Sequence, residues 1–99
     1  MNIYVGVDDT ICYREDKRDD YTLSIPYKER IEKINKLYDE GNIITYWTSR
    51  DNKPGMKWFH LTFNQLKEWG CKFHNLSSLK PNYDMIIDSK AENFSIFKK

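Results

Sequence analysis

Apolar and polar positions alternate over residues 2–7, where most residues are β-branched or aromatic, and this pattern predicts a β-strand. The turn-forming residues Asp8, Asp9 and Thr10 follow directly, so the strand would carry polar groups at its carboxyl end. Residues 13–21 are densely charged and have no regular period. This stretch therefore favours an exposed flap or hairpin.

Two later segments have the period of amphipathic helices. From Pro26, which the first helical turn tolerates, apolar residues recur every three or four positions, and Gly41 is expected to end this helix. A second helix is predicted over residues 56–69, with Gly70 as its stop. Its aromatic side chains are expected mostly in the core, with some left for a subunit interface.

Further strands are predicted over residues 42–47, 71–76 and 83–87, and a last short helix over residues 91–97. This order of strands and helices is typical of a parallel α/β sheet with short crossovers, in which ligands bind at the carboxyl ends of the strands. We therefore expect one functional edge, formed by the polar residues that follow the predicted strands: Asp8, Asp9, Thr10, Thr48, Ser49, Arg50, Lys80 and Asp88.

The composition fits one globular domain over residues 1–99, with 39% hydrophobic and 31% charged residues. A net charge of +1 does not provide the broad positive field of a nucleic-acid-binding protein. No apolar run approaches the ~18 residues of a membrane span, and Met1 leads into a strand instead of a targeting peptide, so we expect a cytoplasmic protein. The spacing of Cys12 and Cys71 favours two reduced, partly buried thiols over a disulfide or a zinc site.

The residues at the expected edge suit phosphoryl transfer, which needs a nucleophile, a proton donor, a divalent cation and groups that hold the phosphate. Asp8 is placed to act as general acid and base. Thr48 and Lys80 can bind phosphate oxygens, and the carboxylate of Asp88 is a hard ligand of the kind that Mg²⁺ prefers.

Four segments in order, residues 5–12, 46–50, 61–70 and 80–91, resemble the small capless phosphatases of the haloacid dehalogenase (HAD) superfamily. Within that family they are most similar to the subgroup associated with capsule and lipopolysaccharide biosynthesis. The resemblance covers nearly the whole chain. It implies an HAD-like (Rossmann-like) parallel sheet flanked by helices, without a cap domain and with a short flap. It further implies Mg²⁺-dependent hydrolysis of a small phosphorylated metabolite, such as a sugar phosphate, through an aspartyl-phosphate.

The resemblance also implies a role for each matching residue. Asp8 would be the acid/base residue and would offer its backbone carbonyl to Mg²⁺, and Asp88 would be the carboxylate ligand. The candidate phosphate-binding residues are Thr48, Ser49 and Lys80. Arg50 is open between contact with the substrate and a solvated place in a loop. Because capless members often close the site with a neighbouring subunit, a homo-oligomer is compatible with this assignment.

One departure from the family pattern bears on activity. Gly6 stands where the family has the aspartate that serves as nucleophile and metal ligand, and Ser89 replaces an acidic residue often found beside the Asp88 position. Glycine has no side chain to take over either role. The alternatives are thus a catalytically silent protein that binds a phosphorylated ligand or a protein partner, or a shifted register with Asp8 as nucleophile and Thr10 two residues on.

A phospho-receiver domain is a further alternative, since it also combines aspartates, a threonine and a lysine at the edge of a parallel sheet. The order of residues argues against it. A receiver needs its acceptor aspartate before the threonine and the lysine, whereas Thr48 and Lys80 precede Asp88 here.

Overall fold

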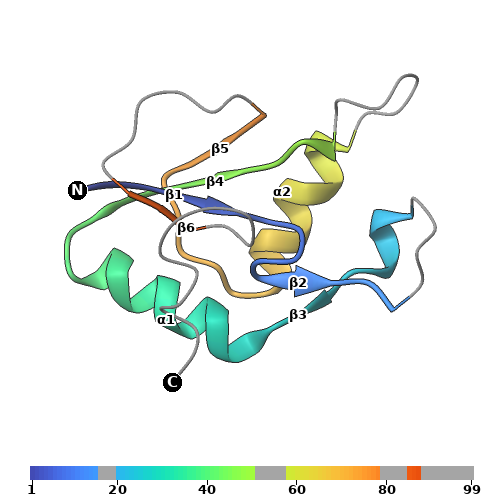
Figure 1. The fold of residues 1–99 in the computed structure, drawn as a ribbon, viewed down its shortest axis with the longest axis horizontal. Helices are drawn as coiled ribbons and strands as arrows, with labels where there is room; N and C mark the ends of the chain where they lie inside the picture. Colours follow the sequence, from blue (N-terminus) through green and yellow to red (C-terminus); the bar gives the residue numbers. More distant parts are fainter. Residues whose placement is uncertain (16–19, 51–57, 79–84, 88–99) are drawn as a thin grey trace.

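The computed structural model describes residues 1–15, 20–50, 58–78 and 85–87 (Figure 1). Within these ranges four parallel strands form one sheet in the order β5-β4-β1-β6. The strands are β1 (Asn2–Gly6), β4 (Ile43–Trp47), β5 (Asn75–Ser77) and β6 (Met85–Ile87). The predicted α/β class with a parallel sheet is confirmed. The helix predicted over residues 91–97 lies outside the described residues.

The central strand β1 brings three strand ends to one edge of the sheet. Gly6 pairs with Trp47, the last residue of β4, and Val5 pairs with Ile87, the last residue of β6. The chain first adds strands on one side of β1 and then places β6 on the other side. Such a reversal of strand order marks the crevice where ligands bind in open parallel sheets.

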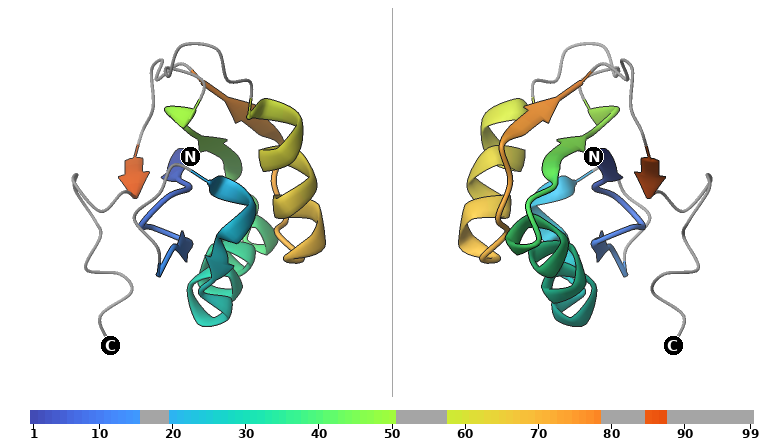
Figure 2. Two further views of the ribbon diagram at one scale, coloured as in Figure 1. Left: turned by 90° about the vertical axis from the view of Figure 1, so that its right-hand side faces the viewer. Right: turned by 90° about the vertical axis from the view of Figure 1, so that its left-hand side faces the viewer.

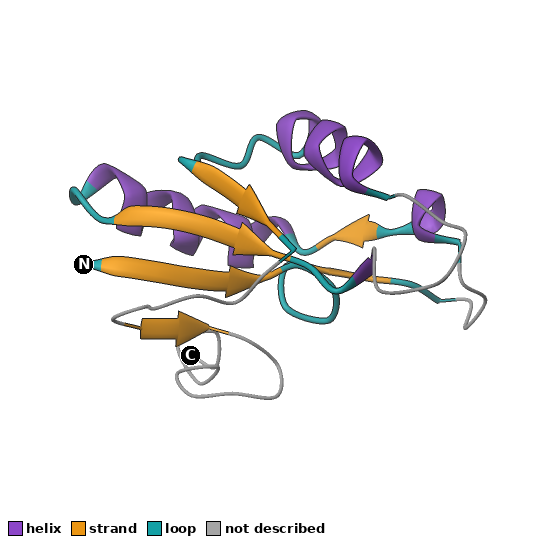
Figure 3. Cartoon of the chain, turned by 90° about the horizontal axis from the view of Figure 1, so that it is seen from above, coloured by secondary structure: helices purple, strands orange, loops and turns teal. Residues whose placement is uncertain are grey.

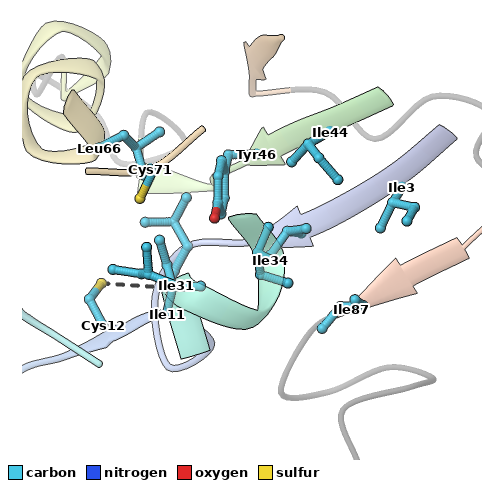
Figure 4. Close-up of a cluster of buried hydrophobic side chains, with 12 residues drawn as sticks. Ile3, Ile11, Cys12, Ile31, Ile34, Ile44, Tyr46, Leu66, Cys71 and Ile87 are labelled. Carbon is cyan, nitrogen blue, oxygen red and sulfur yellow. Dashed lines mark hydrogen bonds between the residues drawn. The ribbon is translucent and has the colours of Figure 1, made fainter. Parts of the chain in front are cut away.

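Helices α1 (Lys28–Asp39) and α2 (Phe59–Glu68) cover the same face of the sheet, as Figures 2 and 3 show. Both belong to crossovers that run in the same direction, which places both helices on one side. The core lies between this face and the helices, and Figure 4 shows its main side chains. The buried cluster consists of Ile3, Val5, Val7, Ile11, Cys12, Ile31, Ile34, Ile44, Tyr46, Leu66, Cys71 and Ile87.

The expected flap follows β1 as a short antiparallel pair, β2 (Cys12–Tyr13) and β3 (Ile25–Pro26), with the 3₁₀ turn η1 (Tyr21–Leu23) between them. The prediction that Pro26 lies in the first helical turn is wrong, because Pro26 pairs with Cys12 in this hairpin. The backbone N–H of Tyr27 then donates to the carbonyl of Ile11 (2.8 Å). This bond holds the chain against the loop after β1, so that α1 begins only at Lys28.

The predicted glycine stops are confirmed, since Gly41 and Gly70 follow the two helices with φ of 98° and 75°. The strand predicted over residues 71–76 is displaced toward the C-terminus. The N–H of Cys71 donates to Leu66 (3.0 Å) and closes the end of α2, so pairing with β4 begins only at Asn75. No helix in the described ranges is long and apolar enough to cross a membrane.

Candidate functional site

A buried ion pair joins the ends of β1 and β4. Asp8 lies two residues beyond β1, and Arg50 lies three residues beyond β4. The guanidinium of Arg50 donates from Nε to Oδ2 of Asp8 (2.9 Å) and from Nη2 to Oδ1 (2.7 Å). Arg50 is only 1% exposed, so the alternative in which it is a solvated loop residue is wrong. Paired geometry of this kind is among the strongest hydrogen bonding available to a carboxylate.

The other donors of Arg50 are also engaged. Nη1 donates to Oγ1 of Thr62 (3.0 Å) and to Oε1 of Gln65 (2.7 Å), both on α2, and Nη2 donates to Oγ of Ser24 (3.3 Å). These contacts use all five N–H groups of a guanidinium. Contact between Arg50 and a substrate therefore stays a prediction that would require one of these hydrogen bonds to break.

The same arrangement fastens the flap to the rest of the fold. The guanidinium carbon of Arg50 lies 4.5 Å from the centre of the Tyr21 ring, and Nε2 of Gln65 donates to the carbonyl of Tyr21 (2.7 Å). We call the side chains of Asp8, Tyr21, Ser24, Arg50, Thr62 and Gln65 the Arg50 cluster. It unites the loop after β1, the flap, the end of β4 and α2 around one buried charge.

The turn after β1 bears on which residue could be a nucleophile. Asp9 has a φ of 62°, which aspartate tolerates, and its N–H donates to the carbonyl of Cys12 (2.8 Å). Thr10 is 0% exposed. The shifted register would require Thr10 to exchange protons with a substrate, and a fully buried hydroxyl is badly placed to do so. This geometry favours the register in which Gly6 occupies the nucleophile position.

Thr48 stabilises the turn after β4 through two hydrogen bonds. Its Oγ1 accepts from the N–H of Arg50 (3.0 Å), and its own N–H donates to the carbonyl of Ser77 (3.0 Å). Because a hydroxyl both accepts and donates, Thr48 can still offer one hydrogen to a ligand. It is only 3% exposed, whereas the neighbouring Ser49 is exposed.

The two cysteines are free and buried, as predicted. Burial, together with the negative charge of Asp8, raises the pKa of the Cys12 thiol to about 12. Burial likewise raises the pKa of Cys71 to about 12. A thiol with such a pKa is protonated at neutral pH, so neither is a nucleophile there. His74 is structural, since its Nδ1 accepts from the backbone N–H of Ile44 (3.1 Å).

The predicted Mg²⁺ site stays a prediction, because one of its implied carboxylate ligands falls outside the described residues. No group of three or more His, Cys, Asp or Glu side chains within the described ranges could hold a metal ion. Gly6 has no side chain to offer. The ligand implied at Asp8 is its backbone carbonyl, which the bonds between its carboxylate and Arg50 leave unaffected. Asp88, the other implied ligand, lies outside the described residues.

The structure thus brings together part of the predicted edge. Asp8 lies against Arg50, which the Thr48 turn positions, while Lys80, Asp88 and Ser89 fall outside the described residues. Sequence reasoning missed Thr62 and Gln65 as partners of Arg50. The sequence did contain an indication of this role, since Thr62 and Gln65 lie three positions apart on the side of the predicted helix that also carries Leu66. Polar side chains on the buried side of a helix need hydrogen-bond partners. No family model, curated protein or solved structure matches this chain.

Proposed function

We propose that this chain is an HAD-like domain that binds a small phosphorylated metabolite, such as a sugar phosphate, and does not hydrolyse it. The observation that carries this proposal is Gly6 at the end of β1, two residues before Asp8, where it provides no nucleophile for an aspartyl-phosphate. The buried hydroxyl of Thr10 argues against a register in which Asp8 replaces that nucleophile. Two hydrogen bonds from Arg50 hold the Asp8 carboxylate at the same strand ends.

Binding would use the groups that remain at the strand ends. The hydroxyl of Ser49 is exposed and can donate to a phosphate oxygen. Thr48 is only 3% exposed and holds the turn beside it, so its predicted phosphate contact requires the ligand to reach into this turn. The motif resemblance adds Lys80 as the cation for the phosphate. Such groups can hold a phosphate ester without a reaction, because binding and turnover depend on different residues.

An active phosphatase is the second candidate, and one observation favours it. The side chain of Asp8 is 27% exposed, so it is within reach of a ligand at the carboxyl ends of the strands. A divalent cation would still lack the carboxylate that Gly6 replaces, and the loss of one charged ligand should weaken Mg²⁺ binding by about 1–3 kcal/mol.

The substitution Gly6→Asp tests the proposal. The unmodified protein should bind glucose 6-phosphate in an NMR titration, with shifts at Thr48 and Ser49, and should release no phosphate from it. Gly6→Asp should raise Mg²⁺-dependent hydrolysis of an aryl phosphate by at least about a hundredfold, since loss of a nucleophile can cost ~10⁶ in a hydrolase.

Two further variants serve as controls. Gly6→Asn adds a side chain of the same size without a nucleophile and should stay inactive. Asp8→Asn in the Gly6→Asp background should abolish the gain in hydrolysis. Efficient hydrolysis by the unmodified protein that is lost on Asp8→Asn would overturn the proposal and favour the shifted register. Failure of glucose 6-phosphate to bind would refute the binding function itself.

A further inference from the structure

A hollow lies at the base of the flap, where Tyr13 of β2 and Tyr27 lie beside the first turns of α1. Its volume is about 470 Å³, within the range of about 300–1,000 Å³ that is usual for small-molecule sites. None of its lining residues belongs to the Arg50 cluster. It is therefore distinct from the strand-end site.

The hollow concentrates positive charge. Among the described residues, Lys28, Arg30 and Lys33 line it together with one carboxylate, Glu29, so these side chains have an excess of two positive charges. The whole chain has a formal net charge of only +1. An anion would thus be attracted to this hollow more than to the molecule at large.

Flat groups form part of its wall and are held in place. The rings of Tyr13 and Tyr27 lie 4.7 Å apart at an interplanar angle of 34°, and the guanidinium carbon of Arg30 lies 3.9 Å from the centre of the Tyr27 ring. Nη1 of Arg30 also donates to the carbonyl of Thr10 (3.0 Å). Tyr27 already packs against both Tyr13 and Arg30, so a flat ligand ring would stack on the outer face of Tyr13. Because Tyr13 is already ordered by this contact, stacking costs little further side-chain freedom.

We propose that this hollow binds a small molecule in which a flat ring carries a phosphate group, such as a nucleoside monophosphate. The phosphate meets the cations of α1, and the ring lies against Tyr13. The carboxylate of Glu29 offers an acceptor for a ligand hydroxyl or amino group. This inference does not rest on the function proposed for the strand-end site.

The test is an NMR titration of the isotope-labelled full-length chain with AMP, adenosine and inorganic phosphate. AMP should shift the amide signals of Tyr13, Tyr27 and Lys33. Adenosine and phosphate should each bind at least about tenfold more weakly than AMP, because each lacks one of the two recognised features. Equal affinity for all three probes, or no binding of AMP, would overturn the proposal.

A matched pair of variants on α1 locates the site. Lys33→Glu should raise the Kd for AMP by at least about fivefold at low salt, whereas Lys36→Glu, on the same helix but outside the hollow, should leave it within about twofold. Tyr13→Leu should weaken AMP and leave phosphate unchanged. Equal effects of the two lysine variants would indicate general charge attraction and refute the site.

The two sites can fail separately. Shifts from AMP confined to Thr48 and Ser49 would assign the ligand to the strand-end site and refute the hollow. Binding of glucose 6-phosphate that persists in Lys33→Glu would show that the strand-end function stands whatever the outcome at the hollow.

Discussion

Replacing Asp8 by asparagine tests the Arg50 cluster most directly, because the amide keeps the shape of the carboxylate and removes its charge. One of its two positions facing Arg50 would become an N–H₂ group, which donates and cannot accept. The side chain of Arg50 is 0% exposed, so water cannot replace the lost partner. Asp8→Asn should therefore leave a buried guanidinium without its counter-ion.

The expected cost follows from the burial of the two partners. Removing one member of a buried ion pair costs about 3–5 kcal/mol. Asp8 is 27% exposed and partly screened by solvent, so we expect a smaller cost of about 2–3 kcal/mol. In a domain of this size each kcal/mol lowers Tm by about 4–8 °C, so Tm should fall by roughly 10–20 °C.

Urea denaturation followed by far-UV circular dichroism measures this loss. Asp9→Asn is the matched control, since it makes the same chemical change at the next residue, which is exposed and has a φ of 62° that asparagine accepts. It should change the free energy of unfolding by no more than about 0.5 kcal/mol. If Asp8→Asn were as stable as Asp9→Asn, the account of Asp8 as the counter-ion of Arg50 would be refuted.

Gln65→Leu should speed amide hydrogen exchange in the flap and lower the free energy of unfolding by about 1–3 kcal/mol, because it removes hydrogen-bond partners of both Arg50 and Tyr21. Asn64→Leu, at the exposed neighbouring position, is the control. Equal exchange in both variants would contradict the attachment of the flap to α2 through Gln65. Iodoacetamide at pH 8 should leave Cys12 and Cys71 unmodified until the protein unfolds, since burial raises both pKa values to about 12. The pKa of each thiol is 9.0 in the unfolded chain and about 12 in the folded protein. The free energy of unfolding should therefore fall as the pH rises from about 9 to about 12. Replacing both cysteines by alanine should make this pH dependence smaller.

Local patterns were sufficient to predict most elements of this fold. The alternation over β1, the mostly apolar run of β4 and the glycines after both helices depend on residues that are close in sequence. The rule that parallel strands end at one edge also predicted that Asp8 and the turn after β4 would meet. The prediction for Pro26 was wrong because a long-range contact determines its conformation. Pro26 pairs with Cys12 in the hairpin and does not begin the helix.

The sequence alone was sufficient to predict a polar edge at the strand ends that includes Asp8 and the residues after β4, because that prediction needs only residue identity and strand order. It did not determine whether Arg50 faces solvent, a ligand or the protein interior. A buried guanidinium is stable only when several groups satisfy its donors at once, and here Asp8, Ser24, Thr62 and Gln65 come from four separate parts of the chain. Only the tertiary structure brings them together, and that is why the role of Asp8 as partner of a buried charge emerged from the fold.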